Sequence, residues 1–517
     1  MNMPTRPVVD HLDRERALNI AESFIVQAPA GSGKTELLIR RYLGLLARVE
    51  HPEEIVAITF TNKAAAEMRE RVCRALVEAR GVPPAESGHE YKTWQLAQAV
   101  LARNESRQWH LQENPGRLRI QTVDSFCAFL TRQMPLLSRL GAQPGTVEDP
   151  EPLYREAAAR TLAQLEAGDT WSGHIAALLA YLDNDLPRAR DLLAAMLKQR
   201  DQWLRHIVGG VQRENLEGAL RRLVDDSLAG LRREFPAALA TELVTLLNFA
   251  AENLERGDSP SVIRACSGLE ALPAGESAAL PQWQGVADLL LIKENKWRKA
   301  VTVSQGFPPG EKGGKPGAAA MKDRMQALLA QLAENELLLR RLVEVRHLPP
   351  IIYDDREWEI AEALSALLLL ADAELRVVFS ERNQIDFMGI AMAANAALEE
   401  EGVPTDLALH LDYQIQHLLI DEFQDISINQ YLLLAHLTAG WSAGDGRTLF
   451  LVGDPMQSIY RFREAEVGKF LETWQRQKLG DVSLTPINIR VNFRSRAGIV
   501  NGVNQALAQV MPAAPDI

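Results

Sequence analysis

The sequence is poor in cysteine, with Cys73, Cys127 and Cys266 as its three thiols in 517 residues, and none lies in a CxxC or Cys/His pattern. This argues against a disulfide-stapled secreted module, a structural zinc site and an iron–sulfur centre. No run of about 18 uncharged apolar residues occurs, as a membrane-spanning helix would need. The first residues also lack the apolar stretch of a signal peptide. We therefore expect a soluble, cytoplasmic protein from a reducing compartment, with no membrane partner.

Basic residues are in the minority, since 56 Lys and Arg oppose 68 Asp and Glu, for a formal charge of −12. Taken alone, this charge argues against a nucleic-acid partner. The argument is weak, because binding depends on where basic groups gather and not on their sum. The hydrophobic fraction of 47% and the charged fraction of 24% are those of an ordinary globular protein and exclude a disordered chain. The length suggests about three folding units.

Two kinds of sequence pattern alternate along the chain, one typical of an α/β fold and one of an all-α fold. Short β-rich runs lead into helical stretches near the N-terminus, and this alternation is typical of parallel βαβ units in an α/β fold. A long middle region carries apolar residues at helical spacing without a clear strand and predicts an all-α domain. The predicted strands are 23–28, 55–60, 417–423, 447–454 and 483–493, the helices after the first two strands are 35–49 and 63–79, and the helical region runs from about 149 to 371.

A Gly- and Pro-rich stretch, 304–320, interrupts the helical region. A flexible surface loop is the simpler interpretation. A lysine-bearing loop that touches DNA phosphates is the alternative, and both stay open at this point.

The segment APAGSGKT follows the first predicted strand and opens a helix. That context is what a phosphate-binding loop needs, because backbone N–H groups and the helix N-terminus surround anionic oxygens. Lys34 would reach the β- and γ-phosphates of a nucleotide, and Thr35 would ligate Mg²⁺. The first glycine of the usual pattern is replaced by Ala28. The candidate nucleotide-binding residues are Ala28, Pro29, Ala30, Gly31, Ser32, Gly33, Lys34 and Thr35.

The segment LLIDEFQD places two carboxylates at the end of a predicted strand. A nucleoside triphosphatase needs one acid to hold Mg²⁺ and a second to activate water. Asp421 is the expected metal ligand and Glu422 the expected general base. Lys34 and Asp421 must meet at one Mg·ATP although 387 positions separate them. The helical region must therefore be an insertion in a single α/β motor domain.

A third segment, AITFTNKAAAEMRER, brings polar groups and an aromatic residue to the carboxyl end of a strand, where ligands bind in open α/β sheets. Single-stranded nucleic acid is held by such groups, with bases stacked on the ring. The alternative is that Phe60 belongs to the core. The candidate DNA contacts here are Thr59, Phe60, Thr61, Asn62 and Lys63.

Two further segments, GDPMQSIYRFRE and VNFRS, follow later strands. Gln457 would sense the γ-phosphate, while Phe462 and Arg463 would hold a base and a phosphate of DNA. Phe493 would stack on adenine, and Arg494 would stabilise charge on the γ-phosphate. In both segments a buried aromatic beside a solvated arginine is the alternative.

These blocks, in this order, resemble the UvrD/Rep family of superfamily-1 DNA helicases. A further block, IQTVDSFCAFLTRQ, is similar to a segment of the RecB/AddA branch, the exonuclease V β-subunit type. The resemblance covers 23–71, 119–136 and 417–505. It implies an ATP- and Mg²⁺-dependent helicase that moves 3′ to 5′ on single-stranded DNA in recombinational DNA repair, next to the nucleoid. Duplex-end DNA and the second subunit of a helicase–nuclease complex are the partners that it implies.

The resemblance assigns further roles residue by residue. It implies that Arg41 lies near the adenine and that Ser125 contacts single-stranded DNA, and it supports the roles given above to Gln457 and Arg494. The family's adenine-reading glutamine should fall near Asp13 or Arg14, where no glutamine stands. The chain also ends soon after the opening motif of the second motor domain. We therefore expect a C-terminally truncated protein that binds ATP and DNA but unwinds poorly.

The expected architecture is a RecA-like P-loop motor domain with a parallel sheet, interrupted by a large all-α insertion and followed by the start of a second RecA-like domain. A non-catalytic DNA-binding or scaffold protein with the same fold is the alternative. An ATPase of the ABC or SMC type is disfavoured because no LSGGQ-like signature occurs. The expected boundaries are 1–148 and 372–486 for the first motor domain, 149–371 for the insertion and 487–517 for the second motor domain.

Overall fold

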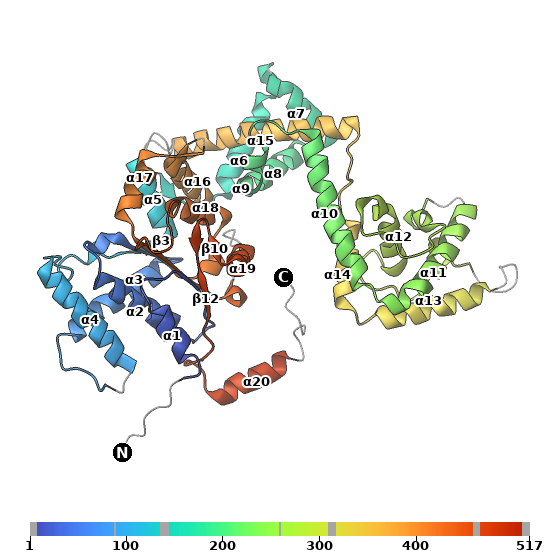
Figure 1. The fold of residues 1–517 in the computed structure, drawn as a ribbon. Helices are drawn as coiled ribbons and strands as arrows, with labels where there is room; N and C mark the ends of the chain where they lie inside the picture. The colour runs from blue at the N-terminus through green and yellow to red at the C-terminus, as the bar shows by residue number, and fades with distance from the viewer. Residues whose placement is uncertain are drawn as a thin grey trace. The chain divides into compact units, whose positions relative to one another are not determined.

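The computed structural model describes residues 8–86, 89–134, 144–168, 170–257, 260–308, 317–400, 402–458 and 466–508. The chain forms two compact units (Figure 1). The first comprises residues 1–160, 190–203 and 371–517, and the second 161–189 and 204–370. The predicted insertion in an α/β domain is therefore present, because the second unit divides the first in sequence.

A six-stranded parallel sheet forms the centre of the first unit, in the order β12-β1-β9-β8-β2-β3. All five predicted strands are in it. The strand missed in the sequence is β3, which lies at the sheet edge and alternates polar with buried residues. The strands are β1 (Phe24–Gln27), β2 (Ile55–Thr59), β3 (Arg119–Thr122), β8 (His417–Ile420), β9 (Thr448–Gly453) and β12 (Thr485–Asn488).

The inner strands β2, β8 and β9 are buried along their whole length, as expected for a sheet that is covered on both faces. Helices α1 to α4 share one apolar core with the sheet, and α5, α16 and α18 pack together on the other side (Figure 1). These helices are α1 (His11–Ala17), α2 (Lys34–Leu46), α3 (Asn62–Glu78), α4 (His89–Ser106), α5 (Val123–Gln133), α16 (Phe387–Leu398) and α18 (Ile428–Leu437).

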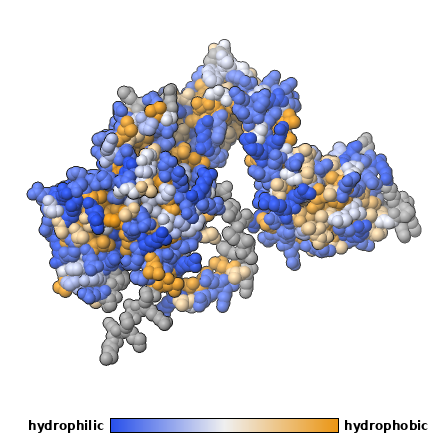
Figure 2. Space-filling model, in the orientation of Figure 1, coloured by the Kyte–Doolittle hydropathy of each residue, from blue (hydrophilic) through white to orange (hydrophobic). Residues whose placement is uncertain are grey.

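Smaller elements complete the first unit. Among them, α20 has no buried residue, and hydrophobic atoms show at its place in Figure 2. The elements are α6 (Glu151–Ala163), α9 (Arg200–Ile207), α17 (Asp406–Gln414), α19 (Val467–Arg476), α20 (Ala497–Leu507) and three two-stranded ribbons, β4 (Gly145–Thr146) with β5 (Gln384–Ile385), β6 (Glu399–Glu400) with β7 (Val403–Pro404), and β10 (Lys478–Leu479) with β11 (Val482–Ser483).

The second unit contains helices and no strand in its described residues, apart from an isolated bridge between Leu291 and Trp297. Its core gathers apolar side chains around the buried Trp283. The helices are α7 (Thr170–Tyr181), α8 (Leu186–Leu197), α10 (Arg213–Glu234), α11 (Ala237–Arg256), α12 (Leu280–Leu290), α13 (Ala318–Leu332), α14 (Glu336–Arg346) and α15 (Asp355–Arg382), of which α8 and α15 extend into the first unit.

The structure places residues 149–160 and 190–203 with the sheet-bearing unit and not with the helical one, unlike the predicted boundary. The reason is a buried ion pair. Arg200 donates two hydrogen bonds to Asp386 at 2.7 and 2.6 Å, and the Tyr154 hydroxyl donates to the same carboxylate at 2.5 Å. A buried arginine needs such a partner, so the pair holds these segments to the unit that contains Asp386.

Candidate functional site

The predicted phosphate loop connects β1 to α2, at the carboxyl edge of the sheet. Gly31 and Gly33 adopt left-handed backbone with φ of 77° and 84°, which glycine does without strain. Ala28 is buried, and its N–H donates to the carbonyl of Gly453 at 2.9 Å, so this residue continues the ladder between β1 and β9. Its φ is not positive. The alanine that departs from the usual pattern therefore stands where the backbone does not need glycine.

The loop carries features of an anion site. Helix α2 begins at Lys34 without a side-chain cap, so its first N–H groups remain available to a ligand. The Ser32 hydroxyl is buried and finds no hydrogen-bond partner among the described residues. A buried polar group without a partner is costly. A bound phosphate would satisfy both, so these residues fit the triphosphate of a nucleotide.

The two acids of LLIDEFQD lie beside this loop, as predicted. The Lys34 Nζ donates to Glu422 Oε2 at 2.7 Å although the two residues come from distant parts of the chain. Asp421 accepts a hydrogen bond from the Glu422 N–H at 3.0 Å, and its own N–H donates to Ile58. Burial and the neighbouring Glu422 charge raise the pKa of Asp421 to about 6. This arrangement is costly for stability and suits a carboxylate that takes a cation.

The backbone at Glu422 is left-handed, with φ of 54°. A non-glycine residue in this conformation is uncommon and costs about 1 kcal/mol or more. The turn aims the side chain at the phosphate loop, where Lys34 meets it. Among the described residues no group of three or more His, Cys, Asp or Glu side chains forms a metal cluster. The predicted ligands Asp421 and Thr35 offer oxygen atoms of the kind that Mg²⁺ prefers, and Mg²⁺ in phosphate sites takes one or two protein ligands together with phosphate oxygens.

The segment after β12 packs directly on the phosphate loop. The Phe493 N–H donates to the Gly31 carbonyl at 2.7 Å, and Asn492 accepts from the N–H groups of Arg494 and Ser495. The Phe493 ring is 60% exposed, as an adenine-stacking residue must be before a nucleotide binds. The structure therefore brings Phe493 and Arg494 to the nucleotide loop.

The N-terminal helix contributes an unpredicted arginine to this place. The Arg14 guanidinium lies 5.0 Å from the centre of the Phe493 ring. It is held by the buried Asp10, which accepts from Arg14 at 2.8 and 2.9 Å and from the N–H groups of Arg490 and Val491. These donors hold the pKa of Asp10 at about 2 against its burial. Arg14 is one of the two positions where the family's glutamine was expected, and the fold brings it beside the Phe493 ring.

Arg41, which the resemblance placed near the adenine, lies in the interior of the first unit. It is fully buried, donates to the carbonyl oxygens of Ala17, Asn19 and Glu22, and lies over the Phe450 ring at 4.4 Å. These bonds fix the turn between α1 and β1, because carbonyl groups that are shielded from water need donors. A place near the adenine stays a prediction for Arg41.

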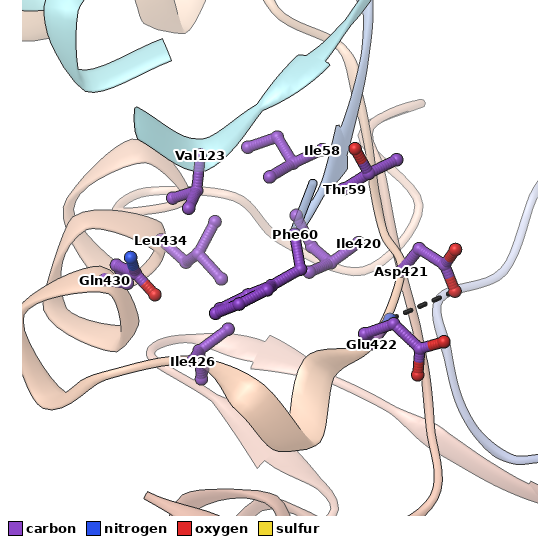
Figure 3. Close-up of a pocket in the computed structure, with 10 residues that line it drawn as sticks. All are labelled: Ile58, Thr59, Phe60, Val123, Ile420, Asp421, Glu422, Ile426, Gln430 and Leu434. Atoms are coloured by element: carbon purple, nitrogen blue, oxygen red, sulfur yellow. Dashed lines mark hydrogen bonds between the residues drawn. The ribbon is translucent and has the colours of Figure 1, made fainter. Parts of the chain in front are cut away.

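The ring of Phe60, one of the predicted DNA contacts, is almost buried. It is 9% exposed and points between apolar side chains (Figure 3), so in this structure the ring packs as the core alternative describes, and its contact with DNA stays a prediction. Thr59 is buried as well, and its hydroxyl donates to the Thr61 carbonyl. Thr59 is the last residue of the inner strand β2, and Phe60 follows it directly. The Phe60 ring lies in a small pocket, which Figure 3 draws. The pocket is lined by Ile58, Thr59, Phe60, Val123, Ile420, Asp421, Glu422, Ile426, Gln430 and Leu434.

The remaining predicted DNA contacts stand at two neighbouring strand ends. Thr61 caps α3 and Thr122 caps α5, each accepting an N–H at 3.1 Å. Because β2 pairs with β3, the exposed Asn62 and Lys63 at one helix start and the exposed Ser125 at the other share one edge of the sheet. We call the surface formed by Asn62, Lys63 and Ser125 the polar edge. Phe462 and Arg463, and residues 309–316 of the 304–320 loop, lie outside the described residues.

Gln457 follows β9 and is held by its own neighbour. Its amide donates to the Asp454 carboxylate at 2.5 Å, and its N–H donates to the Asp454 carbonyl at 2.9 Å. The Gln457 side chain is therefore fixed at the end of the strand that lies beside β1. This strand pairs directly with the strand that leads into the phosphate loop.

A Gly31→Ala variant should lose nucleotide affinity by about tenfold or more. A Cβ at this position would lie 2.6 Å from Asn492 Oδ1 and 2.7 Å from Arg494 Cβ, so the segment after β12 would be pushed off the loop. Gly168→Ala is the matched control, because Gly168 has a similar φ of 73° and nothing within 4 Å. Binding of a fluorescent ATP analogue measures the effect, and equal affinities for the two variants would contradict it.

An Asp421→Asn variant should unfold at a higher temperature than the parent chain in EDTA at pH 7.5. The folded pKa of about 6 lies above the ordinary value, so the folded state holds its proton longer than the unfolded state. The stability contributed by this proton is complete below about pH 4 and is lost as the pH rises to about 6. We expect a gain on the order of 2–3 kcal/mol that vanishes near pH 4. A gain of the same size at both pH values would contradict this cause.

No helix of the described residues combines the length and apolar character that a membrane crossing requires. The comparisons with known proteins agree with the motif geometry. The family model described as "UvrD/REP helicase N-terminal domain" matches residues 11–478. Similar curated proteins are named as ATP-dependent helicase/nuclease subunits: the one from Moorella thermoacetica is 29% identical over 96% of this chain, the one from Desulfitobacterium hafniense 26% over 96%, and the one from Pelotomaculum thermopropionicum 28% over 95%.

The alignments take up 34%, 36% and 38% of those three relatives, so this chain spans about a third of the length of the proteins it matches. Their shared name agrees with the RecB/AddA branch that the sequence blocks indicated. The family match extends through the phosphate loop, the polar edge, the acid pair and Gln457. The chain belongs to the UvrD/REP helicase family, whose N-terminal domain it carries.

Proposed function

We propose that this protein is an ATP-dependent DNA helicase or translocase that moves 3′ to 5′ on single-stranded DNA in recombinational repair. The observation that carries the proposal is the contact between Lys34 and Glu422 at 2.7 Å, beside Asp421 and the uncapped start of α2. A phosphate-binding lysine, a metal-binding acid and a candidate base then meet at one sheet edge. This is the set of groups that phosphoryl transfer to water requires.

In this site Mg²⁺, held by Thr35 and Asp421, would neutralise charge on the phosphates and the leaving group. The chain's own residues do the rest. The loop N–H groups and Lys34 bind the phosphates. Because Lys34 then contacts the phosphates and no longer Glu422, the Glu422 carboxylate is free to take a proton from water. Arg494, next to Gly31, stabilises charge on the γ-phosphate. Phe493 offers a face for the base.

The polar edge is the proposed contact with DNA. The starts of α3 and α5 lie side by side there, and helix starts favour phosphate groups. Lys63 adds a full positive charge on an exposed side chain. Contacts with the phosphate backbone of DNA dominate such binding. Because these contacts depend on the groups at the polar edge, the net charge of −12 for the whole chain does not prevent them.

A Lys63→Ala variant should bind single-stranded DNA several-fold more weakly and lower the slope of log affinity against log salt by about 0.7. With one phosphate contact fewer, the variant displaces fewer counterions when it binds, and this loss is the same for every DNA sequence. Lys478→Ala, also exposed but on the β10–β11 ribbon, is the control. Fluorescence anisotropy of a labelled oligonucleotide from 50 to 200 mM salt measures both quantities. An unchanged salt slope would remove Lys63 from the interface.

The name of the relatives also supports a role in a helicase–nuclease that contains a further, different subunit. We include that partner in the proposal. The polarity is tested with duplexes that carry a single-stranded tail. Strand separation by this chain is expected to be slow, but a 3′ tail should give the faster reaction of the two substrates. A faster reaction on the 5′ tail would overturn the 3′–5′ assignment without touching the ATP site.

A further inference from the structure

The acid pair, Asp421 and Glu422, is joined by a buried amide to the segment 454–457 after β9, which is called the phosphate-sensing loop because it holds Gln457. Gln424 is 1% exposed, and its Nε2 lies 2.9 Å from Glu422 Oε2 and 2.9 Å from Asp425 Oδ2. Its Oε1 accepts the N–H of Asp454 at 2.9 Å. Carboxylates accept and a backbone N–H donates, so the amide can stand in one orientation only.

These bonds form a continuous chain from Lys34 in the phosphate loop to Gln457 after β9. Lys34 contacts Glu422, Glu422 contacts Gln424, Gln424 contacts Asp454, and the Asp454 carboxylate accepts from Gln457. The two ends of the chain, Lys34 and Gln457, are the two residues assigned to the phosphates. Gln424 is its middle member and has no surface of its own to offer a ligand.

The fold makes room for this amide at one glycine. A Cβ on Gly453 would lie 2.5 Å from Gln424 Oε1 and 3.0 Å from the Phe470 ring. The end of β9 must therefore lack a side chain for Gln424 to reach Asp454. Such a close approach between a strand end and a buried polar side chain is a reason for glycine within a strand.

We propose that Gln424 is a positioning residue that holds the Glu422 carboxylate in register with the phosphate-sensing loop. The inference rests on the proposed function. When a nucleotide takes Lys34, Gln424 is the partner that remains on Glu422 among the described contacts. A base left without it would swing on a strained left-handed turn, and a displacement of about 1 Å can cost on the order of a hundredfold in rate.

The test compares Gln424→Met in two backgrounds. In the parent chain, the variant should lower kcat for ATP by about 10- to 100-fold while KM and the nucleotide Kd change less than about threefold, because Gln424 acts on the base and not on binding. In a Glu422→Gln background the same substitution should change the residual kcat less than about twofold. A purely structural role would lower the rate in both backgrounds alike.

Gln424→Glu serves if the methionine variant does not fold, because in its ionised form it keeps the shape and the acceptor for Asp454 but cannot donate to Glu422; the assay is therefore run at alkaline pH. It should lower kcat as Gln424→Met does, and activity like that of the parent chain would overturn the proposal. So would equal losses in the two backgrounds, or a raised KM with unchanged kcat. A parent chain without ATP hydrolysis would instead refute the proposed function, so the two failures are distinguishable.

Discussion

Lys34→Ala should reduce ATP hydrolysis by at least about 10²–10³-fold and should weaken nucleotide binding as well. Lys34 carries the positive charge nearest to the expected phosphates, and removal of one such preorganised donor has effects of this size. The loss would fall on both kcat and KM, because the ammonium group binds the phosphates in the ground state and in the transition state. A phosphate-release assay and a fluorescent nucleotide measure the two.

The matched control is Lys478→Ala, which removes an exposed lysine far along the chain from the loop. It should keep the hydrolysis rate and the unfolding temperature of the parent. Lys34 is 13% exposed and paired with Glu422, so the unfolding temperature of Lys34→Ala must be recorded too. A folded Lys34→Ala chain with parental hydrolysis would place the ATP site elsewhere.

Glu422→Gln should separate hydrolysis from binding. The amide keeps the size of the side chain but cannot take a proton from water, so we expect kcat to fall by about 10²–10⁴-fold. Nucleotide affinity should stay the same or rise, because Lys34 no longer has to break an ion pair with the Glu422 carboxylate before it binds the phosphates. Single-turnover hydrolysis and equilibrium binding give the two values.

Glu70→Gln on α3 is the control for this variant, because Glu70 is exposed and pairs with its helical neighbour Arg74. It should behave as the parent chain in both assays. If Glu422→Gln hydrolysed ATP at the parental rate, another group would be the base. If it lost affinity along with rate, Glu422 would belong to the binding site.

Much of the fold could be predicted from the sequence, because the inner strands are uniformly apolar runs such as IVAIT, each followed by a helix with its own start signal. The insertion followed from the distance between Lys34 and Asp421 along the chain. The edge strand β3 was missed, because its alternation of polar and buried residues gives a weak signal over four positions. The placement of residues 190–203 depends on Arg200 and Asp386, a pair that no local pattern reveals.

The site was predictable where a motif fixes the backbone and not where burial decides. The phosphate loop and the acid pair are local patterns at strand ends, and the structure joins them. Phe60 and Arg41 carry the chemistry of ligand contacts, but their exposure depends on what packs over them from elsewhere in the chain. Arg14 reaches Phe493 only because Asp10 ties the N-terminal helix to the segment after β12.

ATP hydrolysis by this chain, measured with and without a single-stranded oligonucleotide, decides whether the sheet edge is a DNA-driven motor site. We expect hydrolysis that rises with the oligonucleotide and disappears in Lys34→Ala, since the phosphate loop and the polar edge belong to one sheet. DNA binding with no hydrolysis above the level of Lys34→Ala would refute the proposed function and would favour a non-catalytic scaffold with the same fold.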